Sequence, residues 1–201
     1  NEHAAGGYVI EPTPGIYENI IVMDFKSLYP SIIQTFKIDP YSLLMKDVDT
    51  IQTLNGYKFS ASLHILPDFI DELMKLRDIA KKKKDKQLSQ AIKILMNSFY
   101  GVMGSYGCRF YHPDLPRAIT GSGHKLLLGS KDYLENKGLK VVYGDTDSLF
   151  VMLNDISVDD GEAQGKKIVK ELNSFWKNKL KKEFKVESYL ELEFEKYYRK
   201  F

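Results

Sequence analysis

Two aspartates, Asp145 and Asp147, lie two residues apart in a polar segment between two apolar runs. Residues two apart in an extended strand point to the same face, so both carboxylates would project together while Thr146 points the other way. Like charges this close repel each other unless a cation lies near them, which makes a divalent metal ion the natural partner. The composition is equally typical of a solvated turn, and the pair by itself leaves that alternative open.

Asp24 is a third carboxylate in a comparable position, because it follows the apolar run Ile20 to Met23 and precedes the segment FKSLYPSII. Three carboxylates with open coordination positions suit Mg²⁺, which keeps some waters and takes further ligands from substrate phosphates. Two such ions can contact the attacking and leaving oxygens of a phosphoryl transfer. The pattern therefore predicts a phosphoryl-transfer site with two Mg²⁺ ions, for which Mn²⁺ could substitute.

In the sequence between Asp24 and Asp145, basic residues recur at the spacing of a helix. Lys93, Asn97 and Tyr100 fall at i, i+4 and i+7 on one face of a predicted helix, and Arg77 and Lys81 share a face of the preceding one. Arginine can bind a triphosphate through its forked guanidinium and lysine as a point charge. From the spacing alone, a solvated helix position is the favoured interpretation for Lys93, as it is for the lysine run that follows Lys81.

Hydrophobic periodicity and turn signals indicate the elements that must position these residues. The segment VVYGDTDSLFVML predicts a hairpin with the aspartate pair at its turn. Asn55 and Gly56 predict a second hairpin with a two-residue turn of positive φ. Helices are expected over residues 31–37, 66–103 (an αα-hairpin broken by the lysine run), 117–136 and 161–182, and extended segments over 8–23 and 188–195. The predicted fold class is α+β, with helices covering an antiparallel sheet.

Composition limits the class of protein further. Of the 201 residues, 43% are hydrophobic, which suffices for one or two buried cores. Apolar runs stay short of the ~20 residues that span a bilayer, so we expect a soluble, cytoplasmic protein without a membrane partner. A single cysteine, Cys108, excludes an internal disulfide and a cysteine-based zinc cluster. The net charge of +2 does not by itself indicate a nucleic-acid partner.

Three segments resemble, in order and setting, the polymerase motifs of the family B DNA polymerases. They are Asp24–Ile33 (DFKSLYPSII), Lys93–Gly101 (KILMNSFYG) and Tyr143–Ser148 (YGDTDS). The similarity runs through essentially the whole chain, and LPDFIDELMKLRDIAKKK, CRFYHPDLPRAITGSGHK and LELEFE look closest to the bacterial DNA polymerase II branch. The resemblance implies template-directed DNA synthesis, in which a dNTP is joined to a primer 3′-OH by a two-metal mechanism.

The same resemblance implies a role for individual residues. Asp24, Asp145 and Asp147 would be the catalytic carboxylates. Asp24 and Asp147 would bind the two metal ions together with the backbone carbonyl of Phe25. Asp145 would lie just outside these direct ligands.

The resemblance also implies the contacts to nucleotide and DNA. Those to the nucleotide would come from backbone amides around Ser27, Leu28 and Tyr29, from the phosphate-holding Arg77, Lys81 and Lys93, and from Asn97 at the nascent base pair. The ring of Tyr29 would also exclude a 2′-hydroxyl. Contacts to DNA would come from Tyr100, Gly101 and the glycine pair Gly6 and Gly7, where a missing Cβ lets the backbone approach the template. Ala4 stands where the family often has a tyrosine, which puts that template contact in doubt.

In this interpretation residues 1–65 and 104–201 form a palm, and residues 66–103 form helical fingers. The family's exonuclease and thumb would lie outside the chain, as would any contact with a sliding clamp. The partners implied within it are primer–template DNA and dNTP. Glu191 and Glu193 match carboxylates beside the family's active site, but on a strand they could equally lie on a solvent-exposed face.

Two alternatives from other functional classes stay open. One is a catalytically silent DNA-binding module that keeps the fold. The other is a two-metal nuclease, which would share the carboxylates but would not need Tyr29 or a phosphate-binding helix. For the 201 residues by themselves we expect weak polymerisation or none.

Overall fold

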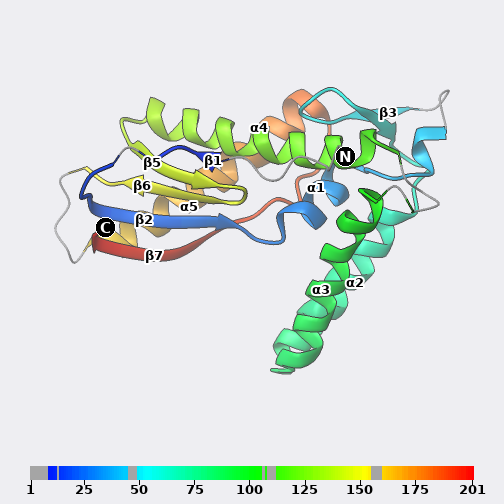
Figure 1. Ribbon diagram of the computed structural model, residues 1–201, viewed down its shortest axis with the longest axis horizontal. Helices are drawn as coiled ribbons and strands as arrows, with labels where there is room; N and C mark the ends of the chain where they lie inside the picture. Colours follow the sequence, from blue (N-terminus) through cyan, green and yellow to red (C-terminus); the bar gives the residue numbers. More distant parts are fainter. Residues whose placement is uncertain (1–8, 13, 45–48, 106, 108–111, 155–159) are drawn as a thin grey trace.

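The computed structural model describes residues 9–12, 14–44, 49–105, 107, 112–154 and 160–201. Five antiparallel strands form its main sheet in the order β1-β5-β6-β2-β7. Two long helices, α4 (Asp114–Asn136) and α5 (Gly161–Lys179), cover one face of this sheet, and a helical hairpin projects from one end of it (Figure 1). The predicted α+β class, with helices on an antiparallel sheet, is confirmed.

Strand β2 is the longest buried strand of the sheet and lies between β6 and β7. The strands of the sheet are β1 (Val9–Ile10), β2 (Glu18–Phe25), β5 (Lys140–Asp145), β6 (Ser148–Met152) and β7 (Leu192–Lys200). Residues 20–23 of β2 are at most 4% exposed, and β6 and β7 flank the strand on its two edges. The strands β5 and β6 form the predicted hairpin, so the sheet delivers the YGDTDS turn to the end of β2.

The helices α4 and α5 are fixed against each other by one large side chain. The indole Nε1 of Trp176 donates to Ser130 Oγ at 2.9 Å. Its ring lies over Gly129, where a Cβ would come within 2.7 Å of it. Because Gly129 leaves this space, the helices can approach closely, and the rings of Tyr133 and Phe175 also pack with centroids 4.5 Å apart. These contacts hold α4 and α5 against each other on the face of the sheet that they cover.

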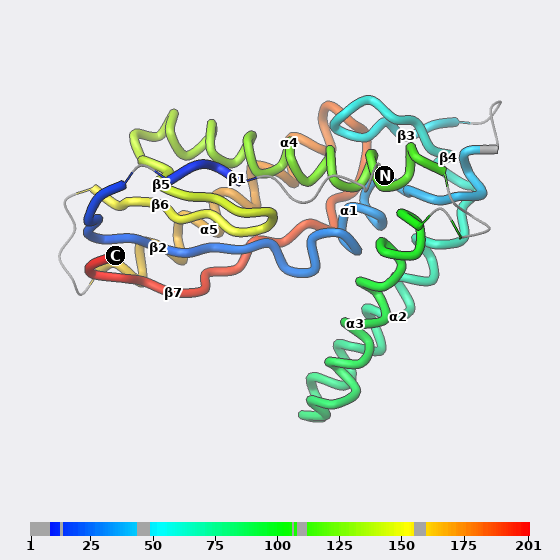
Figure 2. The backbone as a smooth tube through the Cα atoms, in the orientation of Figure 1, coloured from blue at the N-terminus to red at the C-terminus, as the bar shows by residue number. Residues whose placement is uncertain are grey.

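The projecting hairpin consists of α2 (Leu66–Lys82) and α3 (Lys86–Met103) (Figure 2). Asp85 ends the short connection and caps α3, because its carboxylate accepts the Leu88 N–H at 3.0 Å. Near the base of the hairpin, the rings of Phe69 and Phe99 pack edge to face with centroids 5.6 Å apart. The lysine run therefore lies at the tip, away from the sheet, as Figure 2 shows.

The base of this hairpin is anchored to α1 (Leu28–Phe36), the helix that follows β2. Asp39, which is 1% exposed, accepts hydrogen bonds from the N–H groups of Ile65 (3.1 Å) and Leu66 (2.7 Å) at the start of α2. A buried carboxylate is stable there because it satisfies free N–H groups and the positive end of the helix dipole. Gln34 Nε2 also donates to Asp71 at 2.6 Å. These contacts set the angle at which α2 leaves the sheet.

Two predicted boundaries were wrong because the local backbone has other partners. Helix α1 begins at Leu28 instead of residue 31, since Ser27 takes a left-handed conformation (φ 48°) that turns the chain directly from strand to helix. Strand β7 begins at Leu192 instead of residue 188. Ahead of it, the Tyr189 N–H donates to Thr35 Oγ1 at 3.0 Å and the Leu190 N–H to Ser188 Oγ at 3.1 Å. Side chains thus take the place of a neighbouring strand.

The hairpin predicted at Asn55 and Gly56 forms, but its turn differs from the prediction. Strands β3 (Thr50–Gln52) and β4 (Lys58–Ser60) are joined by a longer loop, in which Gly56 has a positive φ of 91° and Asn55 does not. Asn55 instead donates through its side chain to the Arg117 carbonyl at 3.0 Å, which attaches the hairpin to α4. The role of Asn55 is therefore this hydrogen bond to α4, and not a positive φ in the turn.

The remaining elements differ from prediction only at their ends. Helix α4 begins at Asp114, and α5 continues into a π-helical turn, η3 (Leu180–Phe184). A short 3₁₀ helix, η1 (Ser42–Leu44), follows α1. Across the part of the chain that the structure describes, no helix is both long and apolar enough to cross a bilayer.

Candidate active site

Two carboxylates that lie far apart in the sequence meet at one end of the sheet. Asp24 is the penultimate residue of β2 and lies opposite Ser148, the first residue of β6. The Phe25 N–H donates to the Asp147 carbonyl at 2.8 Å, which ties the β5–β6 turn to the end of β2. The antiparallel ladder therefore brings together Asp24 and Asp147.

The predicted side-by-side arrangement of Asp145 and Asp147 was wrong. Thr146 has a φ of 43°, and the Asp147 N–H bonds to the Asp145 carbonyl in a tight turn, so the backbone is not extended here. Asp145 instead accepts hydrogen bonds from Thr146 Oγ1 (3.1 Å) and the Tyr143 hydroxyl (3.4 Å). Asp147 accepts one from Ser148 Oγ at 3.3 Å. The two carboxylates thus accept from different partners, although Asp145 still lies near enough to raise the pKa of Asp147.

Negative charge predominates in the immediate surroundings of Asp24. Partial burial, together with the nearby carboxylates of Glu195, Asp147 and Glu193, raises the pKa of Asp24 to about 6. Burial and the neighbouring Asp145 raise the pKa of Asp147 as well. Both shifts mean that the ionised forms are disfavoured where they stand. A cation placed between the carboxylates would relieve this cost.

A cavity of about 450 Å³ opens over Asp24 and Asp147. Most of the residues predicted for the site line this cavity, and they come from β2, α1, both helices of the hairpin and the β5–β6 turn. They are Asp24, Phe25, Ser27, Leu28, Tyr29, Arg77, Lys81, Lys93, Asn97, Tyr100 and Asp147. Asp145 and Gly101 are not among the lining residues, and Gly6 and Gly7 lie outside the described residues.

The cations of the hairpin enter the cavity from α2 and α3. Arg77 Nη1 donates to Ser27 Oγ at 3.1 Å, so its guanidinium lies at the start of α1. Lys93 lies close enough to both carboxylates to lower the pKa of Asp24 and of Asp147, against the larger effect of burial. Burial and the neighbouring cations Arg77 and Lys26 lower the pKa of Lys81. These opposed charges would suit a ligand that carries both metal ions and phosphates.

The first turn of α1 adds backbone donors to the same cavity. Ser27 is the N-cap residue in a left-handed conformation, and its side chain does not cap the helix. The first N–H groups of a helix have no partner within it, and a left-handed residue ahead of them helps to form a concave set of donors. The start of a helix also favours negative charge. The geometry therefore suits a phosphate group.

Two tyrosines form the wall between α1 and α3. The rings of Tyr29 and Tyr100 pack with centroids 4.7 Å apart at an interplanar angle of 37°. Burial, Tyr100 and Asp147 raise the pKa of Tyr29 to about 12, so its phenol is neutral at physiological pH. A rigid, neutral ring in this position restricts the shape of whatever occupies the cavity.

The sequence alone does not decide whether Glu193 faces the active site or solvent. The sequence-based prediction also does not place Lys26 and Glu195 near the active site. Glu193 lies opposite Asp24 in the β2–β7 ladder and lines the cavity, 3.8 Å from Lys26 Nζ. Lys26 lines the cavity too. Glu195 raises the pKa of Asp24 and stands two residues beyond Glu193, a spacing that would have placed both on one strand face.

The residues present fit a metal ion whose remaining ligands come from substrate and water. Across the described residues, no three His, Cys, Asp or Glu side chains are grouped closely enough to hold an ion by themselves. Asp24 and Asp147 are hard oxygen donors, and a bound cation would offset the burial and the neighbouring carboxylates that raise their pKa values. Mg²⁺ commonly binds in this way, through one or two carboxylates, waters and substrate phosphates.

Known proteins are similar to this chain over nearly its whole length. The family model for DNA polymerase family B matches residues 1–201. DNA polymerase II of Escherichia coli (strain K12) is 42% identical over 206 residues, which cover 99% of this chain and 26% of that protein. The DNA polymerase of Thermococcus gorgonarius is 32% identical over 214 residues, again 99% of this chain and 26% of that protein.

A solved structure shows the same fold. The family B DNA polymerase from the hyperthermophilic archaeon Pyrobaculum calidifontis superimposes with a TM-score of 0.66 and 25% identity, over 98% of this chain and 26% of that one. The chain thus spans about a quarter of the length of the relatives that it matches. Because the match extends over nearly the whole chain and not the motifs alone, the chain belongs to the family B DNA polymerases.

Proposed function

We propose that the chain is the nucleotidyl-transferring part of a DNA polymerase, which joins a dNTP to the 3′-OH of a primer as directed by a template. The observation that carries this proposal is one shared cavity. In it the carboxylates Asp24 and Asp147 lie together with the cations Arg77 and Lys93 and with the start of α1. A metal–triphosphate ligand needs this combination of charges, and neither half of it would suit the ligand alone.

We further propose that Asp24, Asp147 and the backbone carbonyl of Phe25 hold two Mg²⁺ ions, for which Mn²⁺ could substitute. Bound ions of this kind supply positive charge to the attacking and leaving oxygens of an in-line displacement. The carboxylates provide fixed ligands, because the ladder and the Phe25 N–H bond hold their backbones in place. Asp145 would keep the turn in shape through Thr146 and Tyr143.

The nucleotide would lie between α1 and the hairpin. Arg77, Lys81 and Lys93 would hold its phosphates together with the amides around Ser27, Leu28 and Tyr29. During transfer, fixed positive groups stabilise the charge that develops on the phosphoryl oxygens. The nascent base pair would contact Asn97, Tyr100 and Gly101, and the template would pass Gly6 and Gly7.

This assignment gives the parts of the fold their roles. Residues 1–65 and 104–201 would act as a palm that carries the carboxylates, and residues 66–103 as fingers that carry the cations. Primer–template DNA and dNTP would be the partners. The base of the fingers, held by Asp39 and Gln34, would determine how the cations meet the nucleotide.

One assay separates this function from its alternatives. We expect the natural protein that contains this chain to extend a labelled primer–template when Mg²⁺ and dNTP are added. Shortening of the primer under these conditions would support a two-metal nuclease instead. Binding of DNA without any change in its length would support a catalytically silent module.

Tyr29→Ala is expected to increase the insertion of ribonucleotides by about tenfold or more relative to deoxynucleotides. The ring of Tyr29 is proposed to occupy the space that a 2′-hydroxyl needs, and exclusion by a clash disappears with the obstacle. The measurement is the ratio of the two specificity constants, kcat/KM, in single-nucleotide insertion. Tyr29→Phe is the matched control, because it keeps the ring and should keep the discrimination. An unchanged ratio in Tyr29→Ala would reduce Tyr29 to a packing partner of Tyr100.

The 201 residues by themselves are expected to extend a primer weakly or not at all. Their relatives are about four times as long. Duplex affinity depends steeply on the number of phosphate contacts, and misplacement of the reactants by ~1 Å can cost about a hundredfold in rate. A titration of labelled primer–template at physiological salt, with Mg²⁺ and dNTP present, measures both properties. Tight binding with processive extension would show that these residues need no further contacts.

A further inference from the structure

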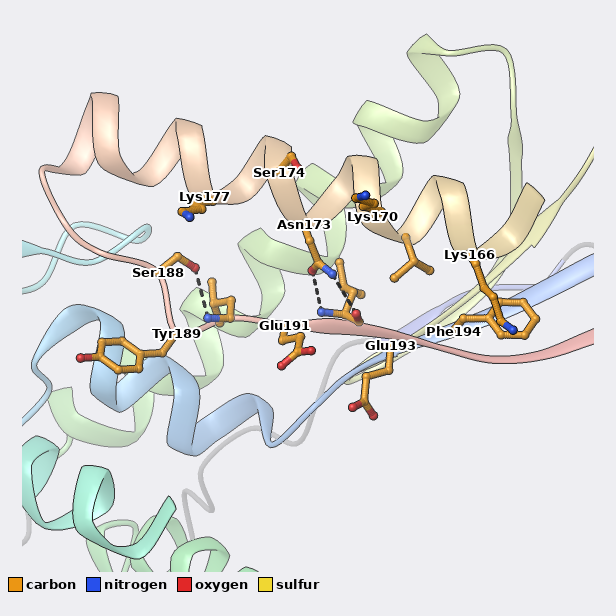
Figure 3. Close-up of a pocket in the computed structure, with 13 residues that line it drawn as sticks. Lys166, Lys170, Asn173, Ser174, Lys177, Ser188, Tyr189, Glu191, Glu193 and Phe194 are labelled. Atoms are coloured by element: carbon orange, nitrogen blue, oxygen red, sulfur yellow. Dashed lines mark hydrogen bonds between the residues drawn. The ribbon is translucent and has the colours of Figure 1, made fainter. Parts of the chain in front are cut away.

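A second cavity, of about 720 Å³, lies between α5 and the segment that leads into β7 (Figure 3). Its lining includes the partly exposed side chain of Leu190 and those of Val169 and Leu192, which are only 7% and 2% exposed. Asn173 joins its two sides, because its side chain accepts from the Leu192 N–H at 2.7 Å and donates to the Leu192 carbonyl at 2.9 Å. These paired hydrogen bonds make the groove a fixed feature of the fold.

Lysines of α5 line one side of this groove. Lys166 is paired with Glu162 at 2.7 Å. Lys170 and Lys177 make no ion pair with any residue that the structure describes. Since they are seven residues apart on one helix, they share a face and are separated by about 10 Å along its axis. They therefore present two unpaired positive charges beside an aliphatic surface.

The acidic residues of the opposite side do not neutralise these lysines. The carboxylates of Glu191 and Glu193 point away from α5, as Figure 3 shows. Glu193 is directed instead to the active-site cavity, where it lies 3.8 Å from Lys26. The whole segment around these lysines is positively charged. Residues 166–185 contain eight lysines and two glutamates, although the net charge of the chain is only +2. Such a surface attracts acidic partners.

We propose that this groove, defined by Lys170, Lys177 and the aliphatic floor of Val169, Leu190 and Leu192, binds an acidic peptide segment of a partner protein. Carboxylates of the segment would pair with the lysines, and an aliphatic side chain between them would fill the floor. Recognition of this kind combines a buried apolar anchor with charged contacts at the rim. The groove shares Glu193 with the lining of the active-site cavity but contains none of the residues proposed to bind metal or nucleotide, so it does not depend on the proposed polymerase function.

The side chains of the groove favour a peptide over a single-stranded nucleic acid. Proteins that bind single strands offer open aromatic rings on which bases stack. The ring of Phe194 is instead packed against Gly165, and Lys166 lies over it at 5.8 Å from its centroid. Tyr189 points away from α5 (Figure 3). An aliphatic floor with lysines at its rim suits carboxylates and leucine-like side chains.

The test measures binding of a short labelled peptide of alternating aspartate and leucine to the natural protein that contains this chain. We expect saturable binding that weakens by about tenfold or more in the double variant Lys170→Glu/Lys177→Glu, since two attractive charge contacts become repulsive. The matched control is Lys181→Glu/Lys182→Glu, which changes the charge equally on exposed residues outside the groove. This control should retain most of the affinity.

Each other outcome would overturn the proposal. An equal loss in the control variant would mean general attraction to positive charge. Equal binding of a peptide with serine in place of leucine would remove the role of the floor. Competition by oligothymidylate, with the same loss in the groove variant, would assign the face to nucleic acid. No binding by the natural protein would mean that the groove is closed there.

Discussion

A protein in which Asp147 is replaced by asparagine is expected to extend primers on the order of a thousandfold more slowly, or not at all, while it keeps most of its affinity for primer–template. The substitution removes one of the two carboxylates at the end of the sheet, which are proposed to hold the metal ions. It removes no cation that would contact DNA. Extension within a few-fold of the unchanged protein would reject Asp147 as a metal ligand.

Stability distinguishes this loss from a folding defect. The raised pKa of Asp147 means that its ionised form destabilises the folded state at neutral pH, and asparagine removes that charge. The asparagine Oδ1 can still accept from Ser148 Oγ, as the carboxylate does at 3.3 Å. We therefore expect the midpoint of thermal unfolding in Asp147→Asn to be equal to or higher than that of the unchanged protein. A lower midpoint would indicate a structural role.

Two control substitutions locate the effect. Asp132→Asn changes the same group on the exposed side of α4 and should leave extension unchanged. Asp145→Asn lies two residues from Asp147 but outside the cavity lining, and it should cost less than Asp147→Asn. Both can be assayed beside Asp147→Asn by steady-state extension and by fluorescence anisotropy of labelled primer–template. If Asp145→Asn loses as much activity as Asp147→Asn, then Asp145 is as important for catalysis as Asp147.

Lys93→Ala is expected to lower kcat/KM for dNTP by about a hundredfold to a thousandfold, with little change in affinity for the template. Lys93 lies in the cavity near both carboxylates and is proposed to stabilise charge on the transferred phosphoryl group. Because that charge grows during transfer, kcat should fall along with any rise in KM. Single-turnover insertion at varied dNTP concentration measures both quantities.

The helix itself offers a matched control for Lys93. Lys86 lies seven residues earlier on the same face of α3, is exposed, and does not line the cavity. Lys86→Ala should therefore leave kcat/KM within about twofold of the unchanged protein, because an exposed helix charge makes only a small contribution. If the two variants lose activity equally, or if neither loses any, Lys93 is a solvated position like its neighbours.

The sequence by itself was enough to predict elements whose pattern is local. The αα-hairpin is periodic over two long segments, and the strands beside the YGDTDS turn are apolar on both sides of it. Asp24 and Lys93 could be proposed as site residues for the same reason, since each occupies a definite place on a strand or a helix. Spacing along one element is determined by backbone geometry, which a sequence records directly.

Only the tertiary structure decided how those elements meet. Asp145 and Asp147 are separated by the left-handed backbone of Thr146, and Glu193 faces Asp24 because of the register between β7 and β2. The sequence predicts Asn55 as a turn residue, yet its side chain donates to the carbonyl of Arg117 on a distant helix. Register, left-handed residues and contacts across the chain depend on packing between distant segments, and no local pattern encodes them. The groove beside Lys170 is of the same kind, because its two sides come from separate elements that only the fold brings together.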